Sequence, residues 1–217
     1  MAGYKRSSWA AAAPVVAAVF VFGVSYGVLA GDAGIPVWQA VLMSATVFAG
    51  SSQFAAVSVL GSGGSAAAAV VAGALLNARY LATGAAAAHV LPGGRLQRFV
   101  GAQLVVDESY ALAVGAGSAQ QPDPRVLIIS GTALWIGWVG GSAIGGLLGP
   151  VVGDPRSLGL DAAFPALFVA LLWPLLDRRS PAVAAIAGLA VAAALLPFTS
   201  AGVALAGAAV AGLTVSR

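Results

Sequence analysis

Three clusters of polar residues interrupt long apolar stretches of this sequence, and their side chains are the ones equipped to bind or react. In chain order they are Gly50, Ser51, Ser52 and Gln53; Asn77, Arg79 and Tyr80; and Asp107 with Glu108. An ionised group halfway along a membrane helix is costly, so such groups face the protein interior and find partners. The sequence therefore predicts an ion pair between Arg79 and one of the two acids.

The two adjacent acids are expected to have different partners. Consecutive residues on a helix point about 100° apart, so only one carboxylate meets Arg79 directly. The other faces a different helix or water, where it balances an ammonium group or carries a proton. The alternative interpretation is a purely structural pair that fixes the register of two helices.

The glycine-serine cluster favours a local helix break. Gly50 relaxes the backbone, and Ser51 and Ser52 are suited to cap a helix that restarts there. The free N–H groups and the positive dipole end of such a helix attract an anionic group. Serines that bond back to their own helix, or that bridge two helices, are the structural alternative. Together the three clusters suit a zwitterion.

The elements that must position these clusters are predicted to be transmembrane helices. The chain has 217 residues, of which 60% are hydrophobic and 8% charged, whereas soluble domains carry about 25% charged residues. Apolar segments lie near 10–30, 37–60, 65–91, 99–118, 126–149, 162–176, 181–197 and 199–215. The connections are too short for a soluble domain. The predicted fold class is an all-α integral membrane protein with a single transporter domain, 1–217. It is a polytopic helical bundle of about 7–8 transmembrane segments, some of them broken or short.

The midpoints of three consecutive segments coincide with the polar clusters. The midpoint of 37–60 falls near Ala49, that of 65–91 near Ala78, and that of 99–118 near Glu108. If each segment crosses the bilayer once, the clusters lie at one depth and enclose a common chamber.

The distribution of Lys and Arg predicts the orientation of the bundle. With eight crossings and a cytoplasmic N-terminus, the cytoplasmic side holds Lys5, Arg6, Arg125, Arg178, Arg179 and Arg217, and the other side holds Arg95, Arg98 and Arg156. This excess favours both termini in the cytoplasm. A re-entrant hairpin at 37–60 would make the two sides nearly equal, so the distribution favours a full crossing.

The residue counts exclude several kinds of chemistry. The chain has no cysteine, one lysine, Lys5, and one histidine, His89. It therefore has no Walker A or Schiff-base lysine and no zinc site of His and Cys, and its serines lack the base of a hydrolase. An enzyme, a cofactor and a metal are not expected. Because the basic residues are scattered along segment ends, nucleic acid is not an expected partner either.

Two further patterns concern packing. Gly137, Gly141, Gly145 and Gly149 recur at every fourth residue and form a groove where another helix can approach closely. We favour a helix of the same chain in this groove, and a second polypeptide is the alternative. Pro165 and Pro174, in 162–176, predict a bent or broken helix.

The motifs "FAGSSQF", "NARY" and "DESYAL", in this order, resemble the AzlC family of branched-chain amino acid permeases. The stretches "GVSYGVLAGDAG", "FPALFVALLWPLL" and "RRSPAV" extend the resemblance over most of the chain. The matching positions within the motifs are Ala49–Gln53, Asn77–Tyr80 and Asp107–Tyr110.

The resemblance implies the large subunit of a two-component exporter of leucine, isoleucine, valine and related amino acids such as methionine. Such a subunit works with a small hydrophobic AzlD-type membrane subunit. The resemblance also implies a location in the bacterial inner membrane and export driven by an ion gradient, with protons as the expected ion.

Roles for individual residues follow from depth and charge. The expected substrate-binding residues are Gly50, Ser51, Ser52, Gln53, Asn77, Arg79 and Tyr80, and the expected proton-coupling or counter-ion residues are Asp107 and Glu108. Phe48, Phe54 and Tyr80 are suited to enclose an aliphatic side chain. A passive channel for a small neutral solute and a structural subunit of a membrane complex are the competing hypotheses. Neither explains an arginine and two acids at one depth.

Overall fold

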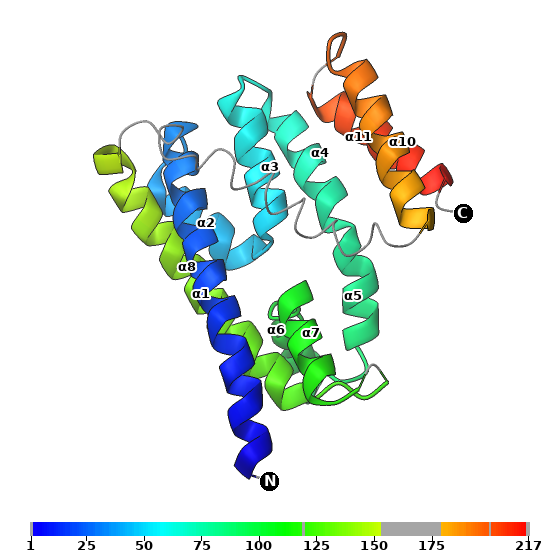
Figure 1. Ribbon diagram of the computed structural model, residues 1–217. Helices are drawn as coiled ribbons and strands as arrows, with labels where there is room; N and C mark the ends of the chain where they lie inside the picture. Colours follow the sequence, from blue (N-terminus) through cyan, green and yellow to red (C-terminus); the bar gives the residue numbers. More distant parts are fainter. Residues whose placement is uncertain (1, 119, 153–178, 200, 216–217) are drawn as a thin grey trace. The chain divides into compact units, whose positions relative to one another are not determined.

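The computed structural model describes residues 2–118, 120–152, 179–199 and 201–215, and the regular elements in these ranges are all helices (Figure 1). They are α1 (Ala2–Asp32), α2 (Val37–Val47), α3 (Gly50–Gly61), α4 (Ala66–Asn77), α5 (Arg79–Ala87), α6 (Arg95–Ala102), α7 (Asp107–Ala116), α8 (Pro124–Val152), α10 (Arg179–Leu195) and α11 (Ala201–Val215). The predicted all-α class is therefore confirmed for the described residues. The segment predicted at 162–176, with Pro165 and Pro174, lies outside them.

Two of the helices are long and apolar enough to cross a membrane by themselves. They are α1, over Ala12–Asp32, and α8, over Pro124–Gly149. A third crossing is reached if α4 and α5 count as one span. The predicted number of segments is not confirmed by this test, because several apolar stretches of the described chain are divided into shorter helices.

The divisions fall beside the polar clusters. Phe48 and Ala49 separate α2 from α3, Ala78 separates α4 from α5, and residues 103–106 separate α6 from α7. Phe48 has a left-handed backbone with φ of 43°. The local helix break predicted at the glycine-serine cluster is present, but it lies directly before the cluster: Phe48 and Ala49 are not helical, and a helix restarts at Gly50.

The chain forms two compact units. The first comprises the described parts of Met1–Gly31, Ile35–Gly50 and Ala78–Gly153, and the second those of Asp32–Gly34, Ser51–Asn77 and Asp154–Arg217. The first unit thus holds α2, α5, α6, α7, α8 and nearly all of α1. The second holds most of α3 together with α4, α10 and α11.

Glycines bring α1 and α8 of the first unit into close contact. A Cβ atom built on Gly145 would lie 2.8 Å from the carbonyl carbon of Val24, and one on Gly27 would lie 2.6 Å from the nitrogen of Gly146. Only residues without side chains allow two helix backbones to approach so closely. The interpretation that the glycine stripe packs against a helix of the same chain is therefore confirmed, and α1 is that helix.

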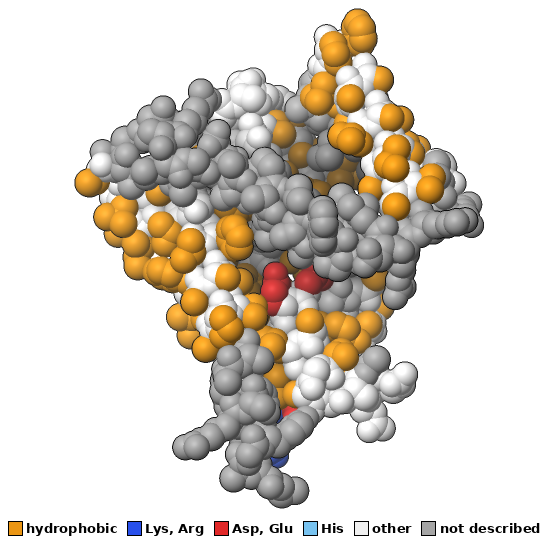
Figure 2. Space-filling view, viewed as in Figure 1, with side chains coloured by type: hydrophobic (Ala, Val, Ile, Leu, Met, Phe, Trp, Pro, Cys, Tyr) orange, Lys and Arg blue, Asp and Glu red, His pale blue; other side chains and the backbone are white. Residues whose placement is uncertain are grey.

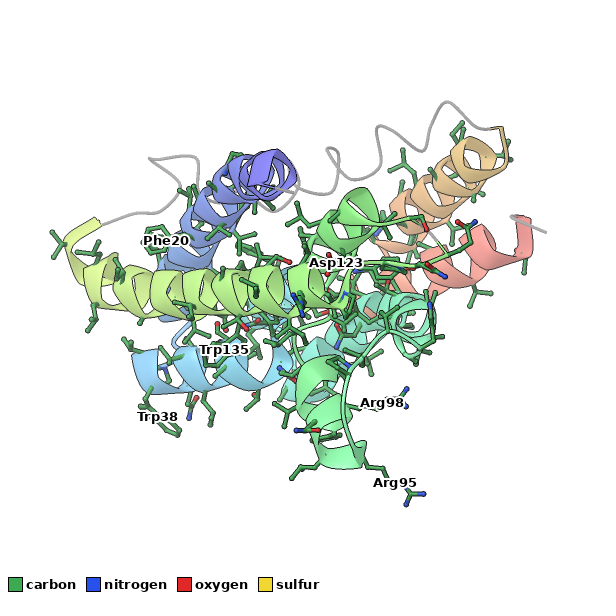
Figure 3. All side chains as sticks on the ribbon, turned by 90° about the horizontal axis from the view of Figure 1, so that it is seen from below. Phe20, Trp38, Arg95, Arg98, Asp123 and Trp135 are labelled. Carbon is green, nitrogen blue, oxygen red and sulfur yellow. The ribbon has the colours of Figure 1, made fainter. Side chains whose placement is uncertain are left out.

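Polar and aromatic contacts join α2 to α8. The hydroxyl oxygens of Ser44 and Ser142 lie 2.7 Å apart in a buried hydrogen bond. Trp135 points from α8 toward α2, as Figure 3 shows, and its Nε1 donates a hydrogen bond of 3.0 Å to the Ala45 carbonyl. The ring of Trp138 lies beside Gly50, since a Cβ atom built on Gly50 would lie 3.0 Å from it.

Small apolar residues pack the second unit. Ala55 and Val59 of α3 form a buried cluster with Ala69 and Ala72 of α4. Beyond this cluster, α4 packs against α11, and α11 packs against α10. The contact between α3 and α4 is thus made by small side chains, which allow helices to lie close together.

Large apolar side chains cover much of the surface. Exposed examples include Val21 on α1, Leu42 on α2, Ile136 and Leu147 on α8, and Leu189 on α10. Figure 2 shows hydrophobic side chains over most of the described surface on the face in view, with few charged ones. Soluble monomers rarely expose large apolar patches, so these surfaces fit contact with lipid.

Candidate functional site

The predicted ion pair forms, and Asp107 is the partner of Arg79. Arg79 Nε lies 3.4 Å from Asp107 Oδ2. Arg79 is the first residue of α5 and Asp107 the first residue of α7, so the pair joins the starts of two helices. The N–H on Nε has no hydrogen-bond acceptor among the described residues, which makes this contact an ion pair rather than an aligned hydrogen bond.

A threonine that the sequence analysis missed holds the other oxygen of Asp107. The Thr83 hydroxyl donates a hydrogen bond of 3.1 Å to Asp107 Oδ1. Thr83 follows Arg79 by four residues, so both side chains lie on the same face of α5. This i, i+4 spacing was the signal available in the sequence. As a result, both carboxylate oxygens of Asp107 are bound by α5.

Tyr80 is the second contact of the Arg79 guanidinium. Arg79 Nη2 donates a hydrogen bond of 3.2 Å to the Tyr80 hydroxyl, and the guanidinium carbon lies 5.0 Å from the centre of the Tyr80 ring. This distance is within the range of a cation–π contact. The side chains of Arg79 and Asp107 remain 34% and 36% exposed, so a ligand can reach the pair.

Ser109 fixes the start of α7, where both acids lie. Its hydroxyl oxygen accepts a hydrogen bond of 3.0 Å from the Val106 N–H and lies 2.8 Å from the Leu104 carbonyl, to which it donates. Asp107 and Glu108 therefore occupy the first turn of a helix, where the positive end of the helix dipole stabilises negative charge. Glu108 is partly buried.

The glycine-serine cluster begins α3, and its serines do not cap the helix as predicted. Ser51 and Ser52 are 2% and 4% exposed. The Ser52 hydroxyl donates a hydrogen bond of 3.0 Å to Asn77 Oδ1, at the end of α4, and so bridges two helices. The Ser51 hydroxyl has no hydrogen-bond partner among the described residues. Gln53 is 1% exposed in the same turn.

The structure gathers the predicted site residues into two groups. Arg79, Tyr80, Asp107 and Glu108 lie together in the first compact unit, which also holds Gly50. Ser51, Ser52, Gln53 and Asn77 lie in the second unit. A chamber common to all nine residues stays a prediction.

These features define the class of the protein. Its surface and helices are those of a helical membrane protein, and the three polar clusters lie beside interruptions of apolar helices. Interrupted helices of this kind are typical of substrate and ion sites in transporters. The family model described as "AzlC protein" matches residues 14–152, and the chain belongs to the AzlC family.

Two relatives resemble most of the chain. An "Uncharacterized membrane protein" of Archaeoglobus fulgidus is 33% identical over 196 residues, which cover 88% of this chain and 84% of the relative. The "Branched-chain amino acid transport protein AzlC" of Bacillus subtilis is 27% identical over 192 residues, which cover 88% of this chain and 75% of the relative. No solved structure matches the chain.

Proposed function

We propose that this protein is the large subunit of a secondary active transporter that exports branched-chain and related neutral aliphatic amino acids, driven by a proton gradient. The observation that carries the proposal is the partly exposed ion pair of Arg79 and Asp107 at the starts of α5 and α7. The name of the Bacillus subtilis relative supports the substrate class.

The guanidinium of Arg79 is suited to bind a carboxylate. A guanidinium presents five N–H donors in a planar fork that matches a carboxylate. In the described chain one nitrogen, Nη2, donates to Tyr80, and Nε approaches Asp107 without an aligned hydrogen bond. Donors therefore remain for the carboxylate of an amino acid, and the adjacent acids supply negative charge for its ammonium group.

We also propose that residues at the start of α3 contact the substrate. Ser51 has a buried hydroxyl without a hydrogen-bond partner among the described residues, and it lies in the first turn of a helix of 12 residues. Amide N–H groups at such a start favour an anion. We assign substrate contact to Gly50, Ser51, Ser52 and Gln53 of this turn, together with Asn77, Arg79 and Tyr80.

The proposed substrate selectivity is broad among aliphatic side chains. One methylene group in an apolar pocket changes affinity by about 1–3 kcal/mol. Valine, leucine and isoleucine are therefore expected to be difficult to separate, so that all three are carried. The proposal also places the protein in the bacterial inner membrane, with a cytoplasmic N-terminus, beside a small AzlD-type subunit.

Uptake into inside-out proteoliposomes tests the proposal. They contain the full chain, with and without a small AzlD-type subunit, and an acidic lumen. Labelled leucine is expected to accumulate inside in response to the pH gradient. Arg79→Ala is expected to abolish accumulation without loss of folded protein.

Arg95→Ala is the matched control, because Arg95 points away from the protein on α6 (Figure 3). It removes the same side chain and is expected to leave transport unchanged. Absence of leucine flux with folded protein, in both the presence and absence of the small subunit, contradicts the transporter assignment. Normal transport by Arg79→Ala contradicts the site.

A further inference from the structure

Glu108 is the acid of the cluster that does not form an ion pair with Arg79. Asp107 uses Oδ2 for Arg79 and Oδ1 for Thr83, so both of its oxygens are bound by protein. Glu108 is the next residue on α7, and no hydrogen bond or ion pair joins its carboxylate to another side chain in the described chain. The two neighbouring acids therefore differ in what they have available for a ligand.

The charges around Glu108 do not balance. Arg79 carries one positive charge, and Asp107 and Glu108 carry one negative charge each when ionised. Glu108 directly follows Asp107 in the first turn of α7, so its charge adds to that of the ion pair. The three groups together then have a net charge of minus one.

In the described part of the chain, the helices packed against α7 supply no further positive charge at this position. From α5 the remaining polar neighbour is Tyr80, which is a neutral phenol. Asp123, which precedes α8, and Arg125 in its first turn lie near the opposite end of α7, since the Asp123 N–H donates a hydrogen bond of 2.9 Å to the Ala113 carbonyl. An unbalanced charge among apolar helices is unfavourable. The cluster is therefore expected to bind one further cation.

We propose that Glu108 binds either a proton or the ammonium group of the transported amino acid, so that each excludes the other. This inference rests on the proposed function. When substrate binds, the O–H bond of the protonated Glu108 breaks and the proton passes to water. The carboxylate then accepts hydrogen bonds from the ammonium group, which keeps its three hydrogens.

Asp107 has a different part in this exchange. Because its oxygens are held by Arg79 and Thr83, it acts as a positioning residue that orients the guanidinium toward the substrate carboxylate. Because the proton and the ammonium group compete for the Glu108 carboxylate, binding of one is coupled to release of the other, and no second site is needed. Substrate leaving on one side of the membrane frees Glu108 for a proton from that side.

Calorimetric titration of L-leucine into the purified full chain tests the inference. Measurements in two buffers with different ionisation enthalpies give the number of protons released per leucine bound. We expect release to approach one proton at acidic pH and to fall to none as pH rises, with tighter binding at higher pH. The control ligand 4-methylpentanoate is leucine without its amino group, and in the pH range where it is fully ionised its binding is expected to release no proton.

Substitutions separate the two acids. Glu108→Gln is expected to weaken leucine binding at least tenfold at high pH, to remove the proton release and to leave 4-methylpentanoate binding within twofold of the unaltered protein. Asp107→Asn is expected to weaken both ligands but to keep the proton release. If Glu108→Gln does not fold, the number of protons that the unaltered protein releases on binding each of the two ligands still tests the inference.

The outcomes of these titrations distinguish failure of the inference from failure of the proposed function. Leucine binding by the unaltered protein without proton release at any pH overturns the inference and leaves the transporter assignment standing, as does unchanged release by Glu108→Gln. Failure of the folded protein to bind leucine at any pH, both with and without the small AzlD-type subunit, removes the proposed function and the inference with it.

Discussion

Arg79 and Asp107 pair across the starts of two helices, with 3.4 Å between Nε and Oδ2. Each residue opens a helix that follows an interruption in an apolar stretch, α5 after Ala78 and α7 after residues 103–106. The ion pair thus joins two positions where the backbone is already irregular. Such positions are suited to ligands in membrane proteins, because their polar groups are otherwise costly to bury.

Thr83 is expected to be needed for substrate affinity, although it lies outside the three motifs that resemble the AzlC family. Thr83→Val removes the hydrogen bond to Asp107, and bonds to charged groups contribute about 1.5–3 kcal/mol. The apparent KM for leucine is expected to rise about tenfold or more by this measure. Thr83→Ser keeps the hydroxyl and is expected to restore most of the affinity.

Thr132→Val is the control for Thr83. Thr132 is exposed on α8, and its hydroxyl bonds to the Ile128 carbonyl of the same helix. It is expected to transport like the unaltered protein. Equal KM values for Thr83→Val and Thr132→Val would show that Thr83 has no positioning role.

Ser51→Ala is expected to increase stability and reduce substrate affinity at the same time. A buried hydroxyl without a partner destabilises a fold by about 1–3 kcal/mol, and alanine removes it. If Ser51 contacts the substrate, loss of one neutral hydrogen bond weakens leucine binding by about 0.5–1.5 kcal/mol. Thermal unfolding and leucine titration of the same sample measure the two effects.

Ser58→Ala is the matched control, because Ser58 lies on α3 and is exposed. It is expected to change neither quantity. A stabilised Ser51→Ala protein with unchanged leucine affinity would remove Ser51 from the site.

The contact between α1 and α8 is expected to be intolerant of a single methyl group. In Gly145→Ala the new Cβ would lie 2.8 Å from the Val24 carbonyl carbon, so a backbone must move. Overpacking of this kind costs about 1–3 kcal/mol. We expect a lower midpoint of thermal unfolding in detergent. Gly140→Ala, on the same helix with open space around its Cβ position, is expected to show no decrease.

Substitutions of Phe48 measure the backbone strain at the helix break before α3. Its φ of 43° is left-handed, which costs about 1–2 kcal/mol in a residue with a Cβ atom. The side chain is 6% exposed, and losing a buried phenylalanine costs about 3–5 kcal/mol. Both Phe48→Ala and Phe48→Gly are therefore expected to destabilise the protein.

The difference in unfolding temperature between these two variants measures the cost of the left-handed backbone at position 48. Both lack the ring, but only glycine adopts the left-handed region without strain. Phe48→Gly is expected to unfold at a higher temperature than Phe48→Ala. The reverse order would show that the backbone at Phe48 is not strained.

Local properties of the sequence determined the helical class, the apolar segments and the identity of the polar clusters. Apolar content accumulates along a segment, and an arginine or acid inside such a segment stands out whatever surrounds it. The pairing of Arg79 with an acid was predictable for the same reason, since an unpaired charge among apolar residues is unfavourable. The four-residue repeat of Gly141 and Gly145 likewise indicated a close helix contact.

Only the tertiary structure decided which groups meet. Asp107 rather than Glu108 faces Arg79, Thr83 takes the second oxygen, and α1 is the helix in the glycine groove. The break also lies at Phe48 and Ala49 instead of the glycine and serines that follow. These outcomes depend on the direction of each side chain around its helix and on the neighbour it finds there. A sequence gives the spacing of residues along a helix, whereas packing fixes the rotation of one helix against another.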